Sequence, residues 1–232
     1  MKHVSVVQHT SSEWLGAIED HLEGRGIRFS YFRPFVTDGR LPEIVTLGDG
    51  LMLLGGGPFG AAAGRFCLPT LDAEVRLARA CLMLGKPVVG FGLGAQILSL
   101  AADGQVAAAP FALEVGTLRC VRADAFGGLP CQFPAAVIMR DRAVPPAYAS
   151  VIAVDEAGAP AIFQIGANAF GFAGHPAIRR AMLEDLIMEF DEGPANSAAG
   201  LDKLSACQGA IDDALVPIMA GIVAATGWME PS

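Results

Sequence analysis

The chain has 232 residues, a net charge of −8, and a composition that is 53% hydrophobic and only 17% charged. This length fits one α/β domain with an extension, and the apolar composition predicts a large core, a buried oligomer interface, or both. The acidic balance, without a basic patch in the sequence, argues against nucleic acid as a partner.

The spacing of cysteines and histidines predicts neither a disulfide framework nor a metal site. The cysteines are odd in number and form no C-x-x-C pair, which is typical of a protein of the reducing cytoplasm. The histidines near the N-terminus have no carboxylate or cysteine cluster at ligand spacing, so we expect no metal and no other cofactor. There is no apolar signal core and no apolar run of the roughly 18 residues that a membrane span needs, so we expect no membrane partner. The residues concerned are Cys67, Cys81, Cys120, Cys131, Cys207, His3, His9 and His21.

The first 32 residues predict a β-α-β unit. Residues 4–8 form a short β-branched run, Ser11 or Ser12 is placed to cap a helix that ends near residue 23, and residues 27–32 alternate as a second strand. Such an opening predicts a parallel sheet with a right-handed crossover.

The third predicted strand, residues 51–54, runs directly into Gly55-Gly56-Gly57-Pro58. Glycines at the carboxyl end of a buried strand let backbone N–H groups approach a ligand closely, although a plain turn would have the same composition. Residues 60–64 are small and predict a mobile flap, after which Thr70 is placed to cap a helix over residues 71–84.

A sharp strand-to-helix corner is predicted at Gly92. Residues 87–91 are a buried-strand run, Gly92-Leu93-Gly94 form the turn, and residues 95–102 carry apolar side chains at helical spacing. This is the pattern of a nucleophile elbow, which presents its tip residue beside a helix N-terminus that favours negative charge.

The second half of the chain predicts several short strands followed by helices. Two strand-like runs separated by Pro110 lie within residues 106–122. Residues 191–199 are polar and small, as in a linker, and Pro217 interrupts the apolar helical pattern that follows. Further strands are predicted at 136–139, 150–154, 161–165 and 169–172, which together indicate an antiparallel portion at one edge of the sheet.

The corner resembles that of the class I glutamine amidotransferases, whose motif is G-x-C-x-G-x-Q. This chain has the run GFGLGAQ over residues 90–96, so Gly92 stands where the family has its nucleophilic cysteine. The resemblance implies that Gly56 and Gly57 line the site and supply an oxyanion-hole N–H group. It also implies that Leu93 and Gln96 belong to the ligand-binding set.

A second segment resembles the Q-F-H-P-E motif of the same family. His175 and Pro176 match it, whereas Ala177 stands at the position of the glutamate. Glu114, in the run EVG, resembles a family E-x-G segment and joins the ligand-binding set. The resemblance therefore implies that His175 keeps the position of the catalytic base, while the nucleophile and the carboxylate that would orient the imidazole are absent.

These patterns predict a three-layer α/β fold with a mostly parallel central sheet flanked by helices. Residues 1–190 are expected to form the amidotransferase-like domain, and residues 191–232 a linker and a C-terminal helical extension. Because Leu204, Ile211 and Ile218 fall on one helical stripe, we expect the extension to dock on a second copy, as a homodimer, or on a partner subunit. The alternative is a helix folded back on its own sheet.

The function predicted from the resemblance is that of an amidotransferase-like protein without glutaminase activity, acting as a ligand-binding or non-catalytic subunit of a larger enzyme. Its ligand is expected to be a small molecule, such as a carboxylate or an amide. One alternative is an enzyme of changed chemistry that uses His175 with the backbone N–H groups of the corner and of the glycine run. Another is an amidotransferase that uses a different thiol, with Cys67 as the candidate because it follows the flap.

Overall fold

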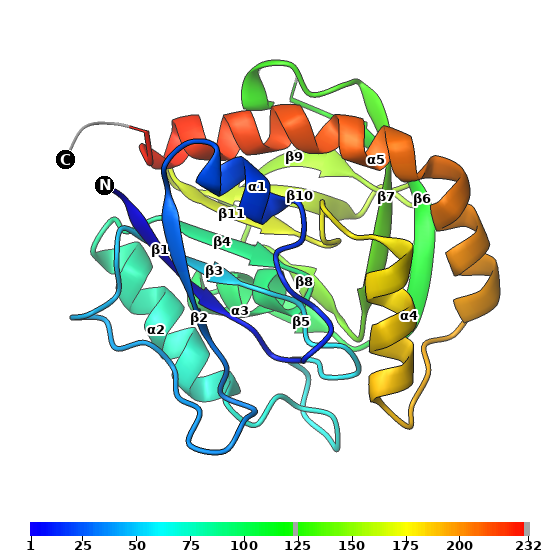
Figure 1. Cartoon of the computed structure of the whole chain (residues 1–232), viewed down its shortest axis with the longest axis horizontal. Coiled ribbons are helices and arrows are strands. Elements are labelled where there is room, and N and C mark those ends of the chain that lie inside the picture. Colours follow the sequence, from blue (N-terminus) through cyan, green and yellow to red (C-terminus); the bar gives the residue numbers. More distant parts are fainter. Residues whose placement is uncertain (123–124, 230–232) are drawn as a thin grey trace.

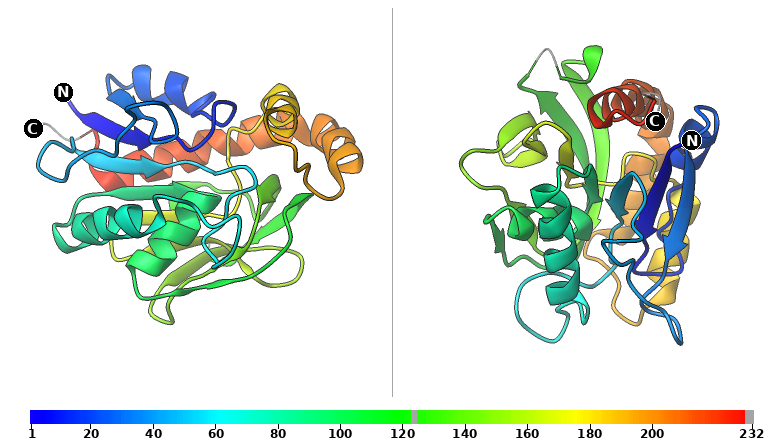
Figure 2. Two further views of the ribbon diagram at one scale, coloured as in Figure 1. Left: turned by 90° about the horizontal axis from the view of Figure 1, so that it is seen from below. Right: turned by 90° about the vertical axis from the view of Figure 1, so that its left-hand side faces the viewer.

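The computed structural model describes residues 1–122 and 125–229 and has one large sheet with helices on both faces (Figures 1 and 2). The nine strands of this sheet lie in the order β2-β1-β3-β4-β11-β10-β9-β6-β7, and β5 pairs with β8 in a separate two-stranded sheet. The strands are β1 (His3–Val7), β2 (Arg28–Phe32), β3 (Gly50–Leu53), β4 (Val88–Phe91), β5 (Gln105–Ala107), β6 (Ala112–Cys120), β7 (Gln132–Met139), β8 (Arg142–Val144), β9 (Ser150–Val154), β10 (Pro160–Ile165) and β11 (Ala169–Phe172). The helices are α1 (Ile18–Glu23), α2 (Leu71–Met83), α3 (Leu93–Ala101), α4 (Arg180–Glu189) and α5 (Ser197–Thr226), with a short 3₁₀ turn at Ala125–Gly127.

The sheet has a parallel half and an antiparallel half, as the sequence predicts. Strands β2, β1, β3, β4 and β11 run parallel to one another, whereas β10, β9, β6 and β7 pair in antiparallel fashion. Strands β3, β4 and β11 are buried throughout, which explains their continuous apolar runs. The carboxyl ends of the parallel strands share one edge of the sheet, where the glycine run, the corner at Gly92 and His175 all follow their strands.

Alternate side chains of the buried strands pack on opposite faces of the sheet. On one face, Leu53, Val88 and Phe163 pack with side chains from α2 and α3. On the other face, Met52 and Phe91 pack with side chains from α1 and α5. The predicted three-layer arrangement is therefore confirmed, and it forms because period-2 side chains need an apolar cover on both faces.

Helix α5 is part of the core of its own chain, so the prediction that it docks on a second copy is wrong. Pro217 was expected to bend or divide the helix. It does not divide it, since α5 is one continuous helix, although α5 bends between its orange and red parts, and the red part lies along one face of the sheet (Figure 1). By length and composition α5 could cross a membrane, but its apolar stripe is packed inside the protein, as in the core helix of a globular domain. Beyond the helix, the Trp228 Nε1–H donates to the carbonyl oxygen of Asp49 at 3.2 Å. The large buried side chains of α5 are Leu204, Ile211, Leu215, Ile218, Met219, Ile222 and Val223.

Two helix starts also differ from the expected caps. Helix α1 begins only at Ile18, after Ala17, so neither Ser11 nor Ser12 caps it. Thr70 does precede α2, but its hydroxyl donates to Glu74 Oε1 at 2.6 Å, and its side chain caps no backbone N–H. The predicted capping residues instead bind carboxylates: the N–H groups of Ser11 and Ser12 donate to Glu189, and the Thr70 hydroxyl donates to Glu74. A local capping pattern does not reveal such partners.

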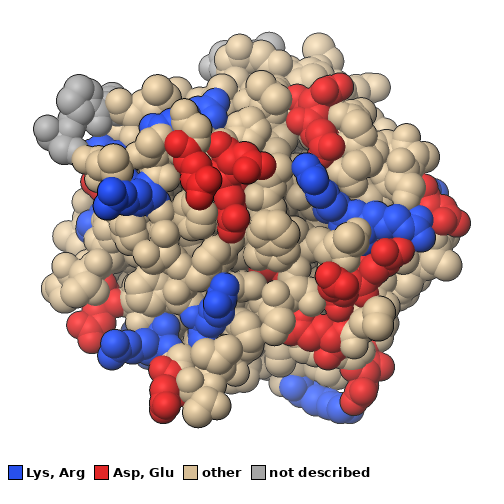
Figure 3. Space-filling model, in the orientation of Figure 1, with Lys and Arg blue, Asp and Glu red and all other residues tan. Residues whose placement is uncertain are grey.

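Acidic and basic side chains are interspersed on the face shown in Figure 3, with uncharged areas between them. The described residues on this face form no continuous basic surface, in keeping with the net charge of −8.

Candidate functional site

The chain turns sharply from β4 into α3 at Gly92, whose backbone has φ 53° and ψ −112°. This positive φ is strained for residues with a Cβ, so glycine is the relaxed choice there. Space alone does not require glycine, because a Cβ at this position would lie 3.4 Å from Gly55 Cα and 4.0 Å from the carbonyl oxygens of Ala173 and Ile138. At Gly94, by contrast, a Cβ would lie 2.1 Å from the Leu53 carbonyl oxygen, so close packing requires that glycine of the motif.

The glycine run lies directly beside this corner and forms what we call the glycine turn, residues 55–57. Leu93 packs against it, since a Cβ on Gly56 would lie 2.3 Å from Leu93 Cδ2. The structure thus places Gly56 against Leu93 and Gly55 against Gly92, while Gly57 lies against Phe190 and Leu186. However, the N–H groups of Gly57 and Gly55 stabilise the carboxylate of Glu13, a residue that the sequence reasoning did not select.

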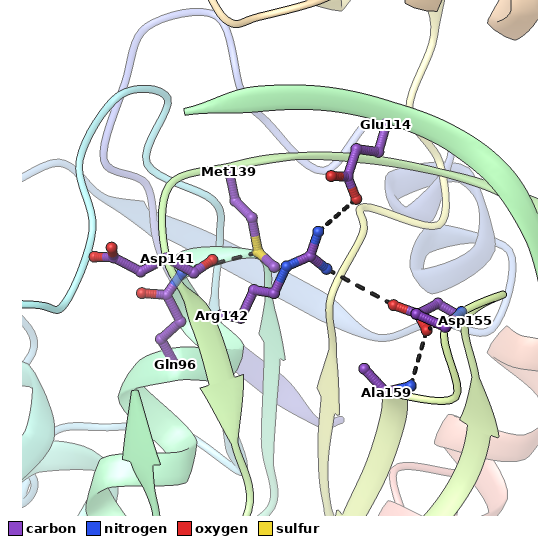
Figure 4. A network of polar contacts seen from close by, with 8 residues as sticks. Gln96, Glu114, Met139, Asp141, Arg142, Asp155 and Ala159 are labelled. Carbon is purple, nitrogen blue, oxygen red and sulfur yellow. Dashed lines mark hydrogen bonds and ion pairs between the residues drawn. The ribbon is translucent and has the colours of Figure 1, made fainter. Parts of the chain in front are cut away.

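Gln96 holds the flap and does not face an open site. Its side chain is fully buried, its Oε1 accepts the N–H of Ala61 at 3.0 Å, and its Nε2 donates to the Arg140 carbonyl oxygen at 2.6 Å. Asp141 adds a second tie, because its Oδ2 accepts the N–H of Ala62 at 2.9 Å. The flap predicted to be mobile is therefore anchored through its backbone to α3 and to the loop after β7, where Gln96 and Asp141 lie side by side (Figure 4).

His175 follows β11, near the corner in the fold, but main-chain groups engage both of its ring nitrogens. Nε2 is 2.9 Å from the Trp14 carbonyl oxygen, to which it donates, and Nδ1 accepts the N–H of Ala177 at 3.2 Å. The ring packs against Phe91, with centroids 5.3 Å apart, on the face of the sheet that α1 and α5 cover. Burial lowers the pKa of His175 to about 4, although the bond to Trp14 opposes this shift. In this structure the imidazole has no nitrogen available to act as a base.

Ala177, which the resemblance matches to the family's glutamate, is a packing residue in this structure. Its side chain is 1% exposed and belongs to the cluster beneath α1 and α5. The backbone of Gly16 lies against it, since a Cβ on Gly16 would be 3.1 Å from the Ala177 carbonyl oxygen. The side chain of residue 177 is therefore an apolar methyl group that packs in the core.

Glu114 lies apart from Gly92, on the wall of a cavity of about 720 Å³. The guanidinium of Arg142 sits between Glu114 Oε2 at 2.6 Å and Asp155 Oδ2 at 3.7 Å (Figure 4). The cavity exists because β6 pairs with β9 only at Arg119 and Cys120 and diverges from it beyond them.

This cavity adjoins the corner. Ala173 lines the cavity, and its carbonyl oxygen is also one of the atoms nearest to a Cβ built on Gly92. Apolar side chains such as Val137, Met139 and Phe163 line much of the cavity, and charged groups stand at its wall. A pocket of this volume that combines apolar and charged lining residues is suited to a small polar molecule.

The structure adds a buried polar cluster that sequence reasoning missed: His9, Glu13 and Glu74. His9 follows β1, and its Nε2 lies 2.7 Å from Glu74 Oε2, while its Nδ1 lies 3.1 Å and 3.0 Å from the carbonyl oxygens of Leu54 and Gly55. The carbonyl oxygens accept from Nδ1, and a carboxylate at Glu74 accepts from Nε2, so these contacts favour the imidazolium form of the ring. Burial lowers the pKa of His9, but the Glu74 carboxylate more than offsets it, and the pKa stands above its ordinary value. The available signal was a histidine and a glutamate four residues apart directly after a strand.

Cys67, the alternative thiol, lies half-buried just after the flap, with Sγ 3.9 Å from the Leu68 carbonyl oxygen. It lines a second cavity of about 430 Å³ together with Arg65 and Arg140. All five cysteines are free thiols. Within the described ranges, no group of three or more His, Cys, Asp or Glu side chains could hold a metal ion.

The α/β fold of this chain is similar to that of solved glutamine amidotransferases. No protein-family model and no curated protein matches the sequence, so the similarity is one of structure. A glutamine amidotransferase from Methylobacillus flagellatus is similar with a TM-score of 0.80 and 22% identity, over 99% of this chain and 95% of that chain. A glutamine amidotransferase from Thermotoga maritima is similar with a TM-score of 0.71 and 19% identity, over 99% of each chain. A Thermoplasma acidophilum protein assigned as a GMP synthase subunit is similar with a TM-score of 0.58 and 17% identity, over 92% of this chain and 95% of that chain.

Proposed function

We propose that this chain is a glutamine amidotransferase-like protein that does not hydrolyse glutamine through a thioester. The observation that carries the proposal is the corner itself, where Gly92 offers no side-chain atom to a substrate. The contacts of His175 support it, because a base needs a free nitrogen within reach of the nucleophile. Loss of a triad nucleophile costs on the order of a millionfold in rate, since triad members act as a unit.

The role that we propose instead is ligand binding as a non-catalytic subunit of a larger enzyme. The ligand is a small carboxylate or amide, and its site is the cavity of about 720 Å³ beside Gly92. The similarity to a protein assigned as a GMP synthase subunit supports a place in a larger assembly. A homodimer is the default assembly where such a partner is missing. Five free thiols favour a reducing compartment such as the cytoplasm.

Thiol chemistry at Cys67 is the second candidate function. It is favoured by one observation, namely that Cys67 lines a cavity with Arg65 and Arg140, which could hold a carboxylate. Against it stands the absence of a paired histidine among the described contacts of Cys67, so its thiol has no general base.

A glutaminase assay with the wild type and three variants tests the proposal. The wild type and Cys67→Ser should both release no ammonia from glutamine above background, and Gly92→Cys should recover little. A matched control is Cys131→Ser, which removes an exposed thiol elsewhere. Turnover by the wild type that Cys67→Ser abolishes and Cys131→Ser preserves would establish the second candidate and overturn the first. Turnover that survives Cys67→Ser would overturn both.

A further inference from the structure

The carboxyl group of Glu13 is pressed against the glycine turn. A Cβ added to Gly55 would lie 1.9 Å from Glu13 Oε1 and 2.4 Å from Oε2. Gly55 also contacts the corner, since its Cα lies 3.4 Å from the position of a Cβ built on Gly92. Any side chain at residue 55 would therefore expel Glu13.

Glu13 is the least satisfied member of its cluster. His9 pairs with Glu74, whose other oxygen accepts the Thr70 hydroxyl, and Glu189 of α4 accepts the N–H groups of Ser11 and Ser12 at 2.8 Å and 2.9 Å. Glu13 is 1% exposed, and its Oε2 has no hydrogen-bond partner among the described residues. Its backbone N–H donates to Thr10 Oγ1 at 3.1 Å.

The backbone of the turn supplies the contacts that a bound carboxylate needs. The N–H groups of Gly57 and Gly55 stabilise the ionised form of Glu13, as does the imidazolium of His9. Consecutive glycine N–H groups around one anion form a concave binding site, of the kind that holds carboxylates and phosphates in other proteins. Since the N–H groups are already in use, a second anion would have to displace Glu13.

We infer that the glycine turn is a carboxylate-binding cradle whose built-in occupant is Glu13, and that Glu13 keeps the cradle closed to small carboxylates such as formate and acetate. This inference goes beyond the proposed function, because Glu13, Gly55 and Gly57 do not line the cavity of the proposed ligand, and it does not depend on what that cavity binds. The N–H groups of Gly55 and Gly57 and the charge of His9 stabilise the ionised carboxyl group of Glu13. Burial and the charge of Glu189 destabilise it.

The arrangement makes the cradle sensitive to protons. The groups facing Glu13 are His9 after β1, whose partner Glu74 belongs to α2, and Glu189 from α4. Burial raises the pKa of Glu13 to about 7, with Glu189 adding to the shift and His9, Gly57 and Gly55 opposing it. Near neutral pH the side chain thus exchanges between an anion that fills the cradle and a neutral acid that binds its N–H groups more weakly.

Chemical rescue of Glu13→Ala tests the inference. This change empties the cradle, so the variant should be destabilised and then specifically restabilised by sodium formate relative to sodium chloride at equal ionic strength. If formate binds with a dissociation constant of about 10 mM, about 100 mM formate shifts the folding equilibrium roughly elevenfold. The matched control is Glu13→Gln, which fills the cradle with a neutral group and should show no formate effect.

Equal responses of Glu13→Ala to formate and chloride would overturn the inference, as would a formate effect of the same size in Glu13→Gln. If Glu13→Ala does not fold, nuclear magnetic resonance of the wild type and Glu13→Gln decides the question. The backbone ¹⁵N–¹H signals of Gly55 and Gly57 should shift together through one titration near neutral pH in the wild type and stay constant in Glu13→Gln. Titration of both signals in Glu13→Gln, or of neither in the wild type, would refute the cradle.

Discussion

Removal of residues 196–232 is expected to unfold the protein, because the apolar side chains of α5 form part of its hydrophobic core. The helix packs over strands β6 and β7 and over the face of the parallel strands, and the indole of Trp228 closes its far end. A truncated chain would leave the apolar face of the sheet in water.

The magnitude follows from the side chains that the deletion removes. Seven large apolar residues of α5 are buried, from Leu204 to Val223. Full burial of such a side chain contributes about 1.5–3 kcal/mol, so their removal costs roughly 10–20 kcal/mol even before the partners they expose are counted. A compact unfolded chain lowers this figure somewhat. Since domains are stable by only about 5–15 kcal/mol, the loss matches or exceeds the whole free energy of unfolding.

Circular dichroism during thermal unfolding, with limited proteolysis beside it, measures the outcome. The truncated chain should show no cooperative transition and should be cleaved throughout. A cooperative transition near the wild-type midpoint would refute the reasoning and restore the view of α5 as an attachment. Two point variants give a finer test. Met219→Ala, at a fully buried site, should cost about 2–5 kcal/mol, while Val216→Ala, at an exposed site on the same helix, should change the free energy of unfolding by less than about 0.5 kcal/mol.

Three further results are expected. Gln96→Ala should lower the free energy of unfolding by about 1–3 kcal/mol and speed amide hydrogen exchange at Ala61, because the flap loses an anchor; unchanged exchange would contradict this. Pro217→Ala should stabilise the protein by up to about 3 kcal/mol, since it restores an N–H within the helix, and a lower melting temperature would show that the ring packs usefully. For Glu13, a folded pKa of about 7 against an ordinary 4.5 means that its contribution is present in full below about pH 4.5 and is lost as pH rises through about 7. That difference corresponds to roughly 3 kcal/mol, so urea unfolding of Glu13→Gln should lose this slope between pH 4.5 and 7, and an unaltered slope would contradict the assignment.

Local patterns predicted the strands and the corner well. The β-branched run before Gly92 and the glycines after it are constrained by their own neighbours, so strand β4 and helix α3 could be predicted within a few residues. The small strand β8, beginning at Arg142, was missed, because three residues carry too little periodicity. The helical structure of α5 was predicted, but the surface on which it packs was not, because an apolar stripe does not specify which surface covers it.

The site was harder to predict than the fold because its polar groups pair across the sequence. His9 and Glu74 are 65 residues apart, and His175 bonds to Trp14 across 161 residues. A motif fixes where a side chain is attached but not which way it turns, so the position of His175 could be predicted while its main-chain partners could not. The sequence predicted that the N–H groups of the glycine turn are free to bind a ligand. In the structure, the N–H groups of Gly55 and Gly57 stabilise the carboxylate of Glu13 instead.

Asp49, at the start of β3, ties together the two ends of the described chain. Its carboxylate accepts the backbone N–H of His3 at 2.9 Å, and its carbonyl oxygen accepts the indole N–H of Trp228 at 3.2 Å. Both ends consequently leave the molecule at the amino edge of the sheet, near each other (Figure 1) and across the sheet from the corner and the glycine turn. An affinity tag or a surface tether attached at either end would therefore present the candidate site outward, and a short peptide joining the two ends would make a circularly permuted chain with the site undisturbed.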